Sequence, residues 1–192
     1  MLNAKICFQV WSLATSDGAG IIFEPYCGAA TNLPDLHMGQ GPNVVAGLIS
    51  KADLNPGSSI FFDNLFTSFP LLQHLSQLGI GGTGTVRQNR LHRVPIMTKK
   101  EMEKKAVPRG ETDVLYMKDV VLVAWKDNKA VYMASNKYEA DIGDPCKRYD
   151  RVLKRKRDVP CPAVVGENFG LVLPLYDSSS HTLSAFYHSL TT

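Results

Sequence analysis

An acidic side chain stands directly after a short apolar segment in the N-terminal half of the chain. Ile60, Phe61 and Phe62 belong to a predicted strand over 57–64, and Asp63 follows them. A carboxylate at the end of a buried strand points away from the sheet edge, where Mg²⁺ binds through one or two carboxylates and substrate phosphate oxygens. Two such ions activate a nucleophile and stabilise the leaving oxygen of a phosphodiester. The alternative interpretation is an aspartate that caps the next turn through its own side chain.

A second candidate for chemistry is the positively charged run "CKRYDRVLKRKR" at 146–157. Lysines and arginines at this density neutralise phosphates and release counterions, which predicts a DNA-binding segment. A nuclear-localisation patch and a solvated loop or helix face are the alternative interpretations. Arg87 and Arg90 follow Asp63 by one predicted helix and would add phosphate contacts. The candidate DNA-binding residues of the run are Lys147, Arg148, Arg151, Lys154, Arg155, Lys156 and Arg157.

The segment "GIGGTG" at 79–84 fits the glycine pattern of dinucleotide-binding sites. Such a site needs the glycines after a strand and at the start of a helix, so that the phosphates meet the helix N-terminus. Here the glycines follow a predicted helix and lead into an extended segment. Because the order is reversed, we expect no nucleotide cofactor.

Hydrophobic periodicity and turn signals predict the elements that position these residues. The clearest helix spans 68–79, because leucines recur on one face, Ser68 is suited to cap its start and Gly79 to end it. A turn at 126–129 divides the strand-like segment 113–136 into a hairpin. The elements predict an α/β or α+β domain built on one sheet with antiparallel hairpins. The predicted strands are 6–15, 20–28, 57–64, 83–90 and the two within 113–136, and the predicted helices are 43–54, 68–79 and 97–107.

Composition and charge narrow the class of protein. The 192 residues are 44% apolar and 20% charged, which is typical of one globular domain, and the net charge of +3 permits a nucleic-acid partner without demanding one. The four cysteines lack the close spacing of a zinc ribbon or a redox pair, and the chain has no secretory start. We therefore expect a reducing, intracellular compartment and no disulfide framework. No apolar stretch approaches the roughly 20 residues that span a membrane.

Several stretches together resemble the piggyBac transposase-derived family. The most specific is "FFDNLFTSFPLLQHLSQLGIGGTGTVRQNR" at 61–90, which is similar to that family's Asp-Asn-aromatic-Phe-Thr-Ser segment, Leu-rich helix and Gly-Thr-Val-Arg-x-Asn-Arg. Segments 8–28, 120–136 and 147–165 resemble the preceding strand pair, the downstream hairpin and the link toward the last catalytic segment. The match predicts a transposase-like domain over 1–167 and a divergent tail over 168–192.

The resemblance implies an RNase H-like mixed sheet with flanking helices, an aspartate triad that binds Mg²⁺, and cutting and joining of DNA at TTAA sites. Asp63 carries over as the first metal-binding aspartate, and Asp141 is the choice for the second, so both are candidate catalytic and metal-binding residues. The family's third aspartate lies in a Gly-Gly-Val-Asp segment, which this sequence lacks after "VPCP" at 159–162. Loss of one acidic ligand leaves Mg²⁺ weakly bound. We expect a domain truncated at its C-terminal side with little strand cleavage.

Two functions follow from these observations. The first is a piggyBac transposase-derived protein related to metal-dependent DNA cleavage and strand transfer, with an incomplete catalytic set. The second is a non-catalytic, transposon-derived module for DNA binding or protein interaction. Both predict DNA as the partner and the nucleus as the location, and the sequence leaves a homodimer open.

Overall fold

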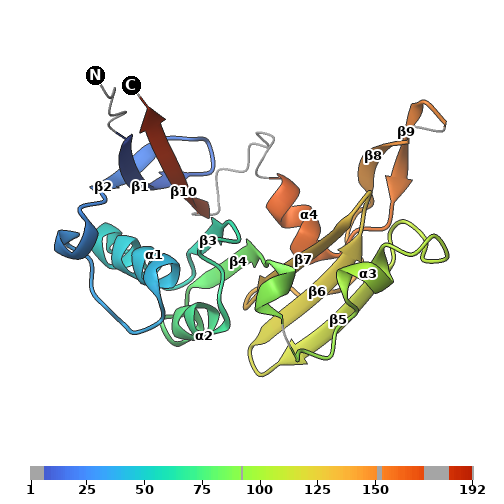
Figure 1. Ribbon diagram of the computed structural model, residues 1–192, viewed down its shortest axis with the longest axis horizontal. Coiled ribbons are helices and arrows are strands. Elements are labelled where there is room, and N and C mark those ends of the chain that lie inside the picture. Colours follow the sequence, from blue (N-terminus) through green and yellow to red (C-terminus); the bar gives the residue numbers. More distant parts are fainter. Residues whose placement is uncertain (1–6, 92, 151–152, 171–181, 192) are drawn as a thin grey trace, which may run out of the picture.

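A mixed β-sheet forms the centre of the computed structural model, which describes residues 7–91, 93–150, 153–170 and 182–191 (Figure 1). The strand order is β2-β1-β10-β3-β4-β7-β6-β5, and β8 and β9 form a separate two-stranded sheet. The strands are β1 (Cys7–Thr15), β2 (Gly20–Pro25), β3 (Ser59–Phe62), β4 (Gly81–Thr85), β5 (Thr112–Met117), β6 (Val120–Lys126), β7 (Ala130–Ser135), β8 (Cys146–Asp150), β9 (Arg155–Val159) and β10 (Thr182–Thr191). The helices are α1 (Gln40–Ala52), α2 (Phe69–Gln77), α3 (Lys99–Met102) and α4 (Ala163–Gly170), with 3₁₀ turns η1 (Gly28–Ala30) and η2 (Gln88–Arg90).

Strand β3, which precedes Asp63, lies between two parallel neighbours, β10 and β4, whereas the other pairings in the sheet are antiparallel. This mixed pattern confirms the predicted α/β class with antiparallel hairpins. Strand β10 comes from the predicted tail and inserts between β1 and β3. The rest of the tail at 171–181 lies outside the described residues. The boundary between domain and tail at 167/168 stays a prediction.

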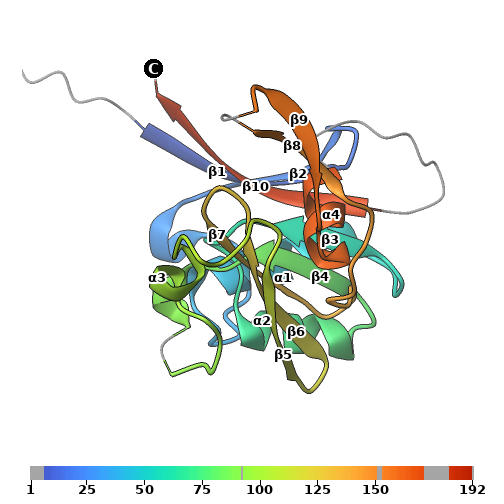
Figure 2. The same cartoon turned by 90° about the vertical axis from the view of Figure 1, so that its right-hand side faces the viewer.

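Strand β6 is buried on both faces, which explains why the sequence around it is continuously apolar. Val120, Leu122 and Ala124 face the larger core, which also contains apolar residues of α1, α2 and β3. Val121, Val123 and Trp125 face a second, smaller core that includes Val164 and Val165 of α4 together with Val159 and Cys161. Figure 2 shows α4 beside the base of β8 and β9. The smaller core therefore joins the basic segment to the central sheet.

Helix α2 confirms the prediction over 68–79. Ser68 Oγ accepts a hydrogen bond from the Leu71 backbone N–H at 3.2 Å, and Pro70 stands in the first turn. The buried leucines Leu71, Leu72 and Leu75 lie on the core side. Gly79 follows the helix with a φ of 69°, a conformation that glycine adopts without the steric cost of a Cβ.

Four predicted elements differ from the structure. The charged helix over 97–107 shortens to α3, which begins with a Thr98–Glu101 capping box and is followed by turns before Pro108. The extended segment 83–90 is β4, which starts earlier, followed by η2. The region 113–136 contains three strands rather than two, because a second turn with Lys118 at a φ of 50° separates β5 from β6. The basic run is a β-hairpin and not a loop or helix face.

A tyrosine ties β7 to the segment before α3. Tyr132 Oη donates a hydrogen bond to the Met97 carbonyl at 2.8 Å. Burial, aided by the negative charges of Glu103, Glu101 and nearby Asp113, raises the pKa of Tyr132 to about 12. The hydroxyl therefore remains a neutral donor throughout the physiological pH range.

Candidate functional site: an acidic sheet edge and a basic hairpin

The side chain of Asp63 lies exposed at the end of β3, where the sequence placed it. Its Oδ1 accepts a hydrogen bond from the Leu65 backbone N–H at 2.7 Å. Its carbonyl oxygen accepts from the Thr67 hydroxyl at 2.8 Å and from the Phe66 backbone N–H at 3.2 Å. Asp63 thus caps the turn at 63–67 as the alternative interpretation predicted, while its carboxylate remains open to solvent.

Arg87 and Arg90 meet this turn, because β3 and β4 are parallel and their carboxyl ends share one edge of the sheet. Arg90 donates from Nη1 to the Thr67 carbonyl at 2.8 Å and from Nη2 to the Leu65 carbonyl at 3.3 Å. Arg87 donates from Nε to Asn64 Oδ1. We name this group, the turn 63–67 with Arg87 and Arg90, the acidic edge. Its arginines bind protein groups, so their role in phosphate contact stays a prediction.

The chain reaches Asp141 from the opposite edge of the sheet. Strand β7 runs antiparallel to β4, so it ends where β3 and β4 begin. Lys137, just beyond β7, donates from Nζ to Ser59 Oγ at the start of β3, whereas Asp63 follows the end of β3. The Asp141 carbonyl then accepts from the Ala163 backbone N–H of α4 at 2.8 Å. Asp63, by contrast, directly follows the end of β3. Within the described residues, neither acid belongs to a group of three side chains that could hold a metal ion.

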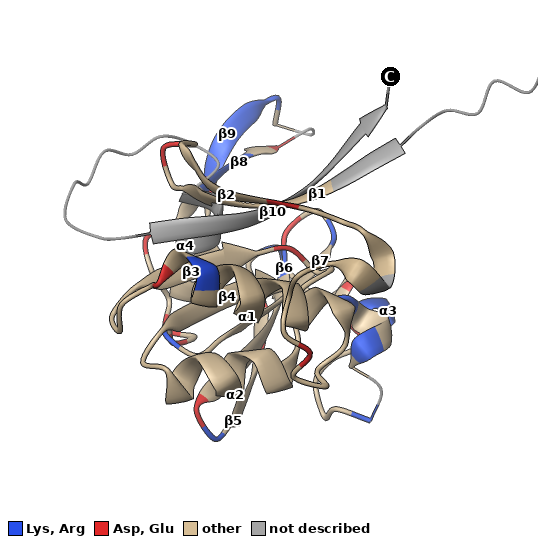
Figure 3. Ribbon diagram, turned by 90° about the vertical axis from the view of Figure 1, so that its left-hand side faces the viewer, with Lys and Arg blue, Asp and Glu red and all other residues tan. Residues whose placement is uncertain are grey.

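The basic run folds into an antiparallel ribbon, which we name the basic hairpin (residues 146–159). Its strands β8 and β9 pair with Tyr149 opposite Lys156, and β9 is exposed along most of its length. Figure 3 shows the positive charge along β9, which stands away from the central sheet. The ribbon explains the exposure, because both faces of an isolated two-stranded sheet contact water.

The cations of the basic hairpin fall into two groups. Arg148 pairs with Asp127 at 3.4 Å and Arg157 pairs with Asp150 at 3.1 Å. Four other side chains are exposed, and among the described residues no ion pair is seen for them. We name these the outward cations, and they are Lys147, Lys154, Arg155 and Lys156. The remaining predicted residue of the run, Arg151, lies outside the described residues.

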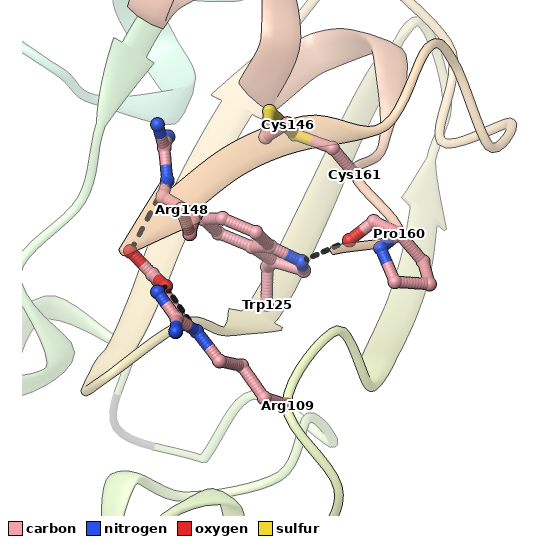
Figure 4. The surroundings of a disulfide bond; sticks show 7 residues. Arg109, Trp125, Cys146, Arg148, Pro160 and Cys161 are labelled. Carbon is pink, nitrogen blue, oxygen red and sulfur yellow. Dashed lines mark hydrogen bonds and ion pairs between the residues drawn. A yellow bond between two sulfur atoms is a disulfide. The ribbon is translucent and has the colours of Figure 1, made fainter. Parts of the chain in front are cut away.

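The base of the basic hairpin is bound to the turn between β6 and β7 (Figure 4). Asp127 accepts from Arg109 Nε at 2.7 Å and also pairs with Arg148. The Arg148 guanidinium lies over the Trp125 ring at 5.7 Å, and Trp125 Nε1 donates to the Pro160 carbonyl at 2.9 Å. In the sequence, Asp127 falls within the turn predicted at 126–129. Its partners lie 18 and 21 positions away along the chain, so no local signal identifies them.

A disulfide bond between Cys146 and Cys161 also closes the base of the basic hairpin. The two Cα atoms are 5.7 Å apart, which is a usual separation for a disulfide. The expectation of no disulfide was wrong. The 15-residue spacing gave no signal, because it matches no known redox or zinc motif and only the pairing of β8 with β9 makes the two cysteines neighbours.

Comparison with known proteins identifies the family. The family model described as Transposase IS4 matches residues 2–167. The chain is 34% identical over 163 residues to the human PiggyBac transposable element-derived protein 3, covering 82% of this chain and 27% of that protein. It is 28% identical over 165 residues to the human PiggyBac transposable element-derived protein 2, covering 84% of this chain and 28% of that protein.

The chain belongs to the piggyBac transposase-derived family. It spans less than a third of the length of these curated relatives. A solved structure, the piggyBac transposase in a synaptic complex with hairpin DNA, is 23% identical with a TM-score of 0.51, covering 71% of this chain and 27% of that one. This likeness confirms the RNase H-like mixed α/β fold.

The piggyBac family, whose transposases are of the DDE class, implies use of a divalent metal, so we asked whether the acids of this chain fit one. A magnesium pair needs carboxylates that converge within a few ångströms. Within the described residues, no three His, Cys, Asp or Glu side chains come close enough to hold a metal ion. Asp63 and Asp141 belong to no such group. The described acids therefore do not fit the family's metal site.

The glycines of the "GIGGTG" segment have a packing role in this piggyBac-derived chain. The segment passes from the end of α2 into β4, as the sequence order predicted. A Cβ on Gly84 would lie 2.4 Å from Thr67 Oγ1 and 2.6 Å from the Phe62 carbonyl oxygen. A Cβ on Gly82 would lie 2.5 Å from Leu75 Cδ1. A Cβ at Gly84 would therefore meet the backbone of β3, whereas a Cβ at Gly82 would displace the end of a leucine side chain of α2.

One cavity lies outside the acidic edge and the basic hairpin. This cavity of about 200 Å³ between β1 and α1 is lined by Trp11, Tyr26 and Asn43 among others, and none of the predicted site residues lines it. Within the described residues, no helix has the length and apolar character needed to cross a membrane.

Proposed function

We propose that this chain descends from a metal-dependent DNA cleavage and strand-transfer enzyme acting at TTAA sites, and that it binds DNA without cutting it. The observation that carries the proposal is the basic hairpin, which presents its outward cations to solvent on an exposed ribbon. The synaptic complex of the related transposase contains DNA, which supports DNA as the partner. The proposal of an incomplete catalytic set is supported by the described residues, among which no three His, Cys, Asp or Glu side chains come close enough to hold a metal ion.

The physical basis of binding is release of counterions from the DNA backbone. Each phosphate neutralised by a lysine or arginine contributes about −0.9 to the slope of log K against log salt concentration. If the outward cations each contact one phosphate, the slope is about −3 to −4. Arg148 and Arg157 add less, because their charges are already opposed by Asp127 and Asp150.

The test is a salt titration of duplex DNA binding by fluorescence anisotropy, from about 0.05 M to 0.3 M salt. We expect a steep inverse dependence of affinity on salt and no change of affinity on Asp63→Ala. Absence of binding at the lowest salt would overturn the proposal.

The alternative function, DNA cleavage, rests on the exposed Asp63 carboxylate at the sheet edge. It is tested with a TTAA-containing duplex incubated with the chain and Mg²⁺, with the Asp63→Ala variant as control. We expect intact DNA in both samples. Metal-dependent nicking that disappears in the variant would establish a catalytic role and contradict the incomplete catalytic set.

Location in the nucleus and assembly as a homodimer are further parts of the proposal. The basic hairpin supports nuclear import as well as DNA binding. A fluorescent fusion should accumulate in nuclei, and replacement of the outward cations by glutamine should reduce that accumulation. Light scattering of the purified chain with and without DNA tests the homodimer, which a monomeric mass in both samples would contradict.

A further inference from the structure

The disulfide lies where it controls the geometry of the basic hairpin. Cys146 is the first residue of β8 and pairs in register with Val159, the last residue of β9. Cys161 follows Val159 by two residues. The bond therefore links the two chain segments that enter and leave the ribbon, so that all four outward cations lie within the loop that it closes.

The remaining contacts at this base are noncovalent and are shared with the central sheet. Arg109 Nη1 donates to the Tyr149 carbonyl of β8 at 3.2 Å. Trp125 Nε1 donates to the Pro160 carbonyl between β9 and Cys161 at 2.9 Å. These two bonds hold one strand each, whereas the disulfide is the covalent link between the strands (Figure 4). Without that link, the ribbon depends on its ladder bonds, on these anchors, on the Arg148–Asp127 ion pair and on the packing of Val159 in the smaller core. The strands beyond this base form an isolated two-stranded ribbon, which is marginal in water.

We propose that the Cys146–Cys161 pair is a redox switch that sets the order of the basic hairpin and thereby its affinity for DNA. The inference rests on the proposed DNA-binding function. In the oxidised form the bond holds the outward cations on one ordered ribbon, so less conformational entropy is lost when they meet phosphates. In the reduced form the ribbon frays and that entropy must be lost on binding.

The chemistry of the switch is thiol–disulfide exchange with a dithiol. The reductant's thiolate attacks a sulfur of the pair, and the other cysteine leaves as a thiolate and takes up a proton. Cys146 is the more accessible partner, because Cys161 is only 1% exposed. The second thiol of the reductant then displaces the bound cysteine. Two electrons and two protons pass to Cys146 and Cys161, and the dithiol becomes a disulfide.

The expected compartment supports a switch rather than a permanent crosslink. In a reducing compartment, protein disulfides are usually transient and act in redox sensing or catalysis. The two cysteines are distant from the acidic edge in the sequence. Their disulfide closes a loop that contains the basic hairpin and no residue of the acidic edge. Oxidation would then tighten DNA binding, and return to reducing conditions would relax it.

The experiment uses a chain in which Cys7→Ser and Cys27→Ser leave the pair as the only cysteines among the four of the sequence. One sample is oxidised with oxidised glutathione and the other is reduced with dithiothreitol, and thiol titration confirms each state. Hydrogen exchange of the amides at 153–159 reports order in the hairpin without DNA. Anisotropy with duplex DNA reports affinity. The matched control adds Cys146→Ser and Cys161→Ser, which removes the switch.

We expect slower exchange in the oxidised sample and DNA affinity about three- to tenfold tighter than in the reduced one, with no redox effect in the control. Equal exchange and equal affinity in the two states would overturn the switch while leaving DNA binding intact. If reduction speeds hydrogen exchange but leaves DNA affinity unchanged, the disulfide orders the basic hairpin without controlling DNA binding, and the proposed regulation is wrong. No DNA binding in either state would instead remove the proposed function, and hydrogen exchange would still decide whether the bond orders the hairpin.

Discussion

The acidic edge and the basic hairpin both contain arginines, but the two regions use them differently. At the acidic edge, Arg90 donates to two backbone carbonyls of the turn that carries Asp63, and Arg87 donates to Asn64. In the basic hairpin, the outward cations have no ion-pair partner among the described residues. An arginine near an acid is therefore not by itself a phosphate site, because its N–H groups can already be donated to protein oxygens, as those of Arg90 are.

The largest effect is expected at the base of the basic hairpin. Asp127→Ala removes the acceptor for Arg109 and Arg148, whose side chains are only 11% and 23% exposed. An unpaired, partly buried charge remains, so we expect the free energy of unfolding to fall by about 3 kcal/mol in urea denaturation. The control Asp144→Ala removes an exposed carboxylate and should change it by less than about 0.5 kcal/mol. Equal effects of the two substitutions would contradict the role of Asp127 in holding the base of the basic hairpin.

The next effect tests how tightly the acidic edge is built. Gly84→Ala places a Cβ against Thr67 and Phe62, so we expect destabilisation of about 1–3 kcal/mol in thermal or urea unfolding. The control is Gly166→Ala in α4, where no heavy atom lies within 4 Å of the added Cβ. There alanine should stabilise the chain by roughly 0.5–1 kcal/mol. A neutral Gly84→Ala would show that the edge is looser than its packing indicates.

A pair of arginine substitutions separates the two regions directly. Arg90→Gln should lower the free energy of unfolding by about 1–2 kcal/mol, because two hydrogen bonds to carbonyls are lost, and should leave the salt slope of DNA binding unchanged. Arg155→Gln should leave stability within about 0.5 kcal/mol and reduce the salt slope by about 1. If Arg90→Gln instead reduced the salt slope and Arg155→Gln reduced stability, Arg90 would be the DNA contact and Arg155 the structural residue.

The smallest effect concerns the turn cap itself. Asp63→Ala removes the acceptor for the Leu65 N–H and should cost about 0.5–1 kcal/mol of stability. Asp63→Asn keeps an oxygen in that position and should cost less. Circular dichroism during thermal unfolding resolves the order of the three proteins. An equal loss with asparagine and with alanine would mean that the charge, and not the hydrogen bond, stabilises the turn.

The sequence predicted those elements that are determined by residues close together in the chain. Helix α2 could be predicted because Ser68, Gly79 and the leucine spacing act within a few residues of one another. Asp63 was placed correctly at the end of β3 for the same reason, since the apolar run stops there. The charged helix was predicted too long, because only its capping box at Thr98 and Glu101 was a reliable signal.

Long-range pairing accounts for what the sequence could not predict. The position of Asp141 relative to Asp63 depends on β7 running antiparallel to β4, and spacing along the chain carries no information about that direction. The basic hairpin does not look like a strand pair in the sequence, because charge replaces the usual apolar alternation. It is held instead by a disulfide and by Trp125 and Asp127, which lie far away in the sequence.

The most direct test of DNA binding through the basic hairpin compares two variants of equal charge. One replaces the outward cations Lys147, Lys154, Arg155 and Lys156 by glutamine, and the other replaces the exposed lysines Lys99, Lys100, Lys104 and Lys105 in and after α3. We expect the first variant to lose about 3–4 units of salt slope and at least about 100-fold of DNA affinity at low salt, and the second to keep both nearly unchanged. Equal losses in the two variants would mean that DNA responds only to net charge, and would contradict a DNA-binding role of the basic hairpin.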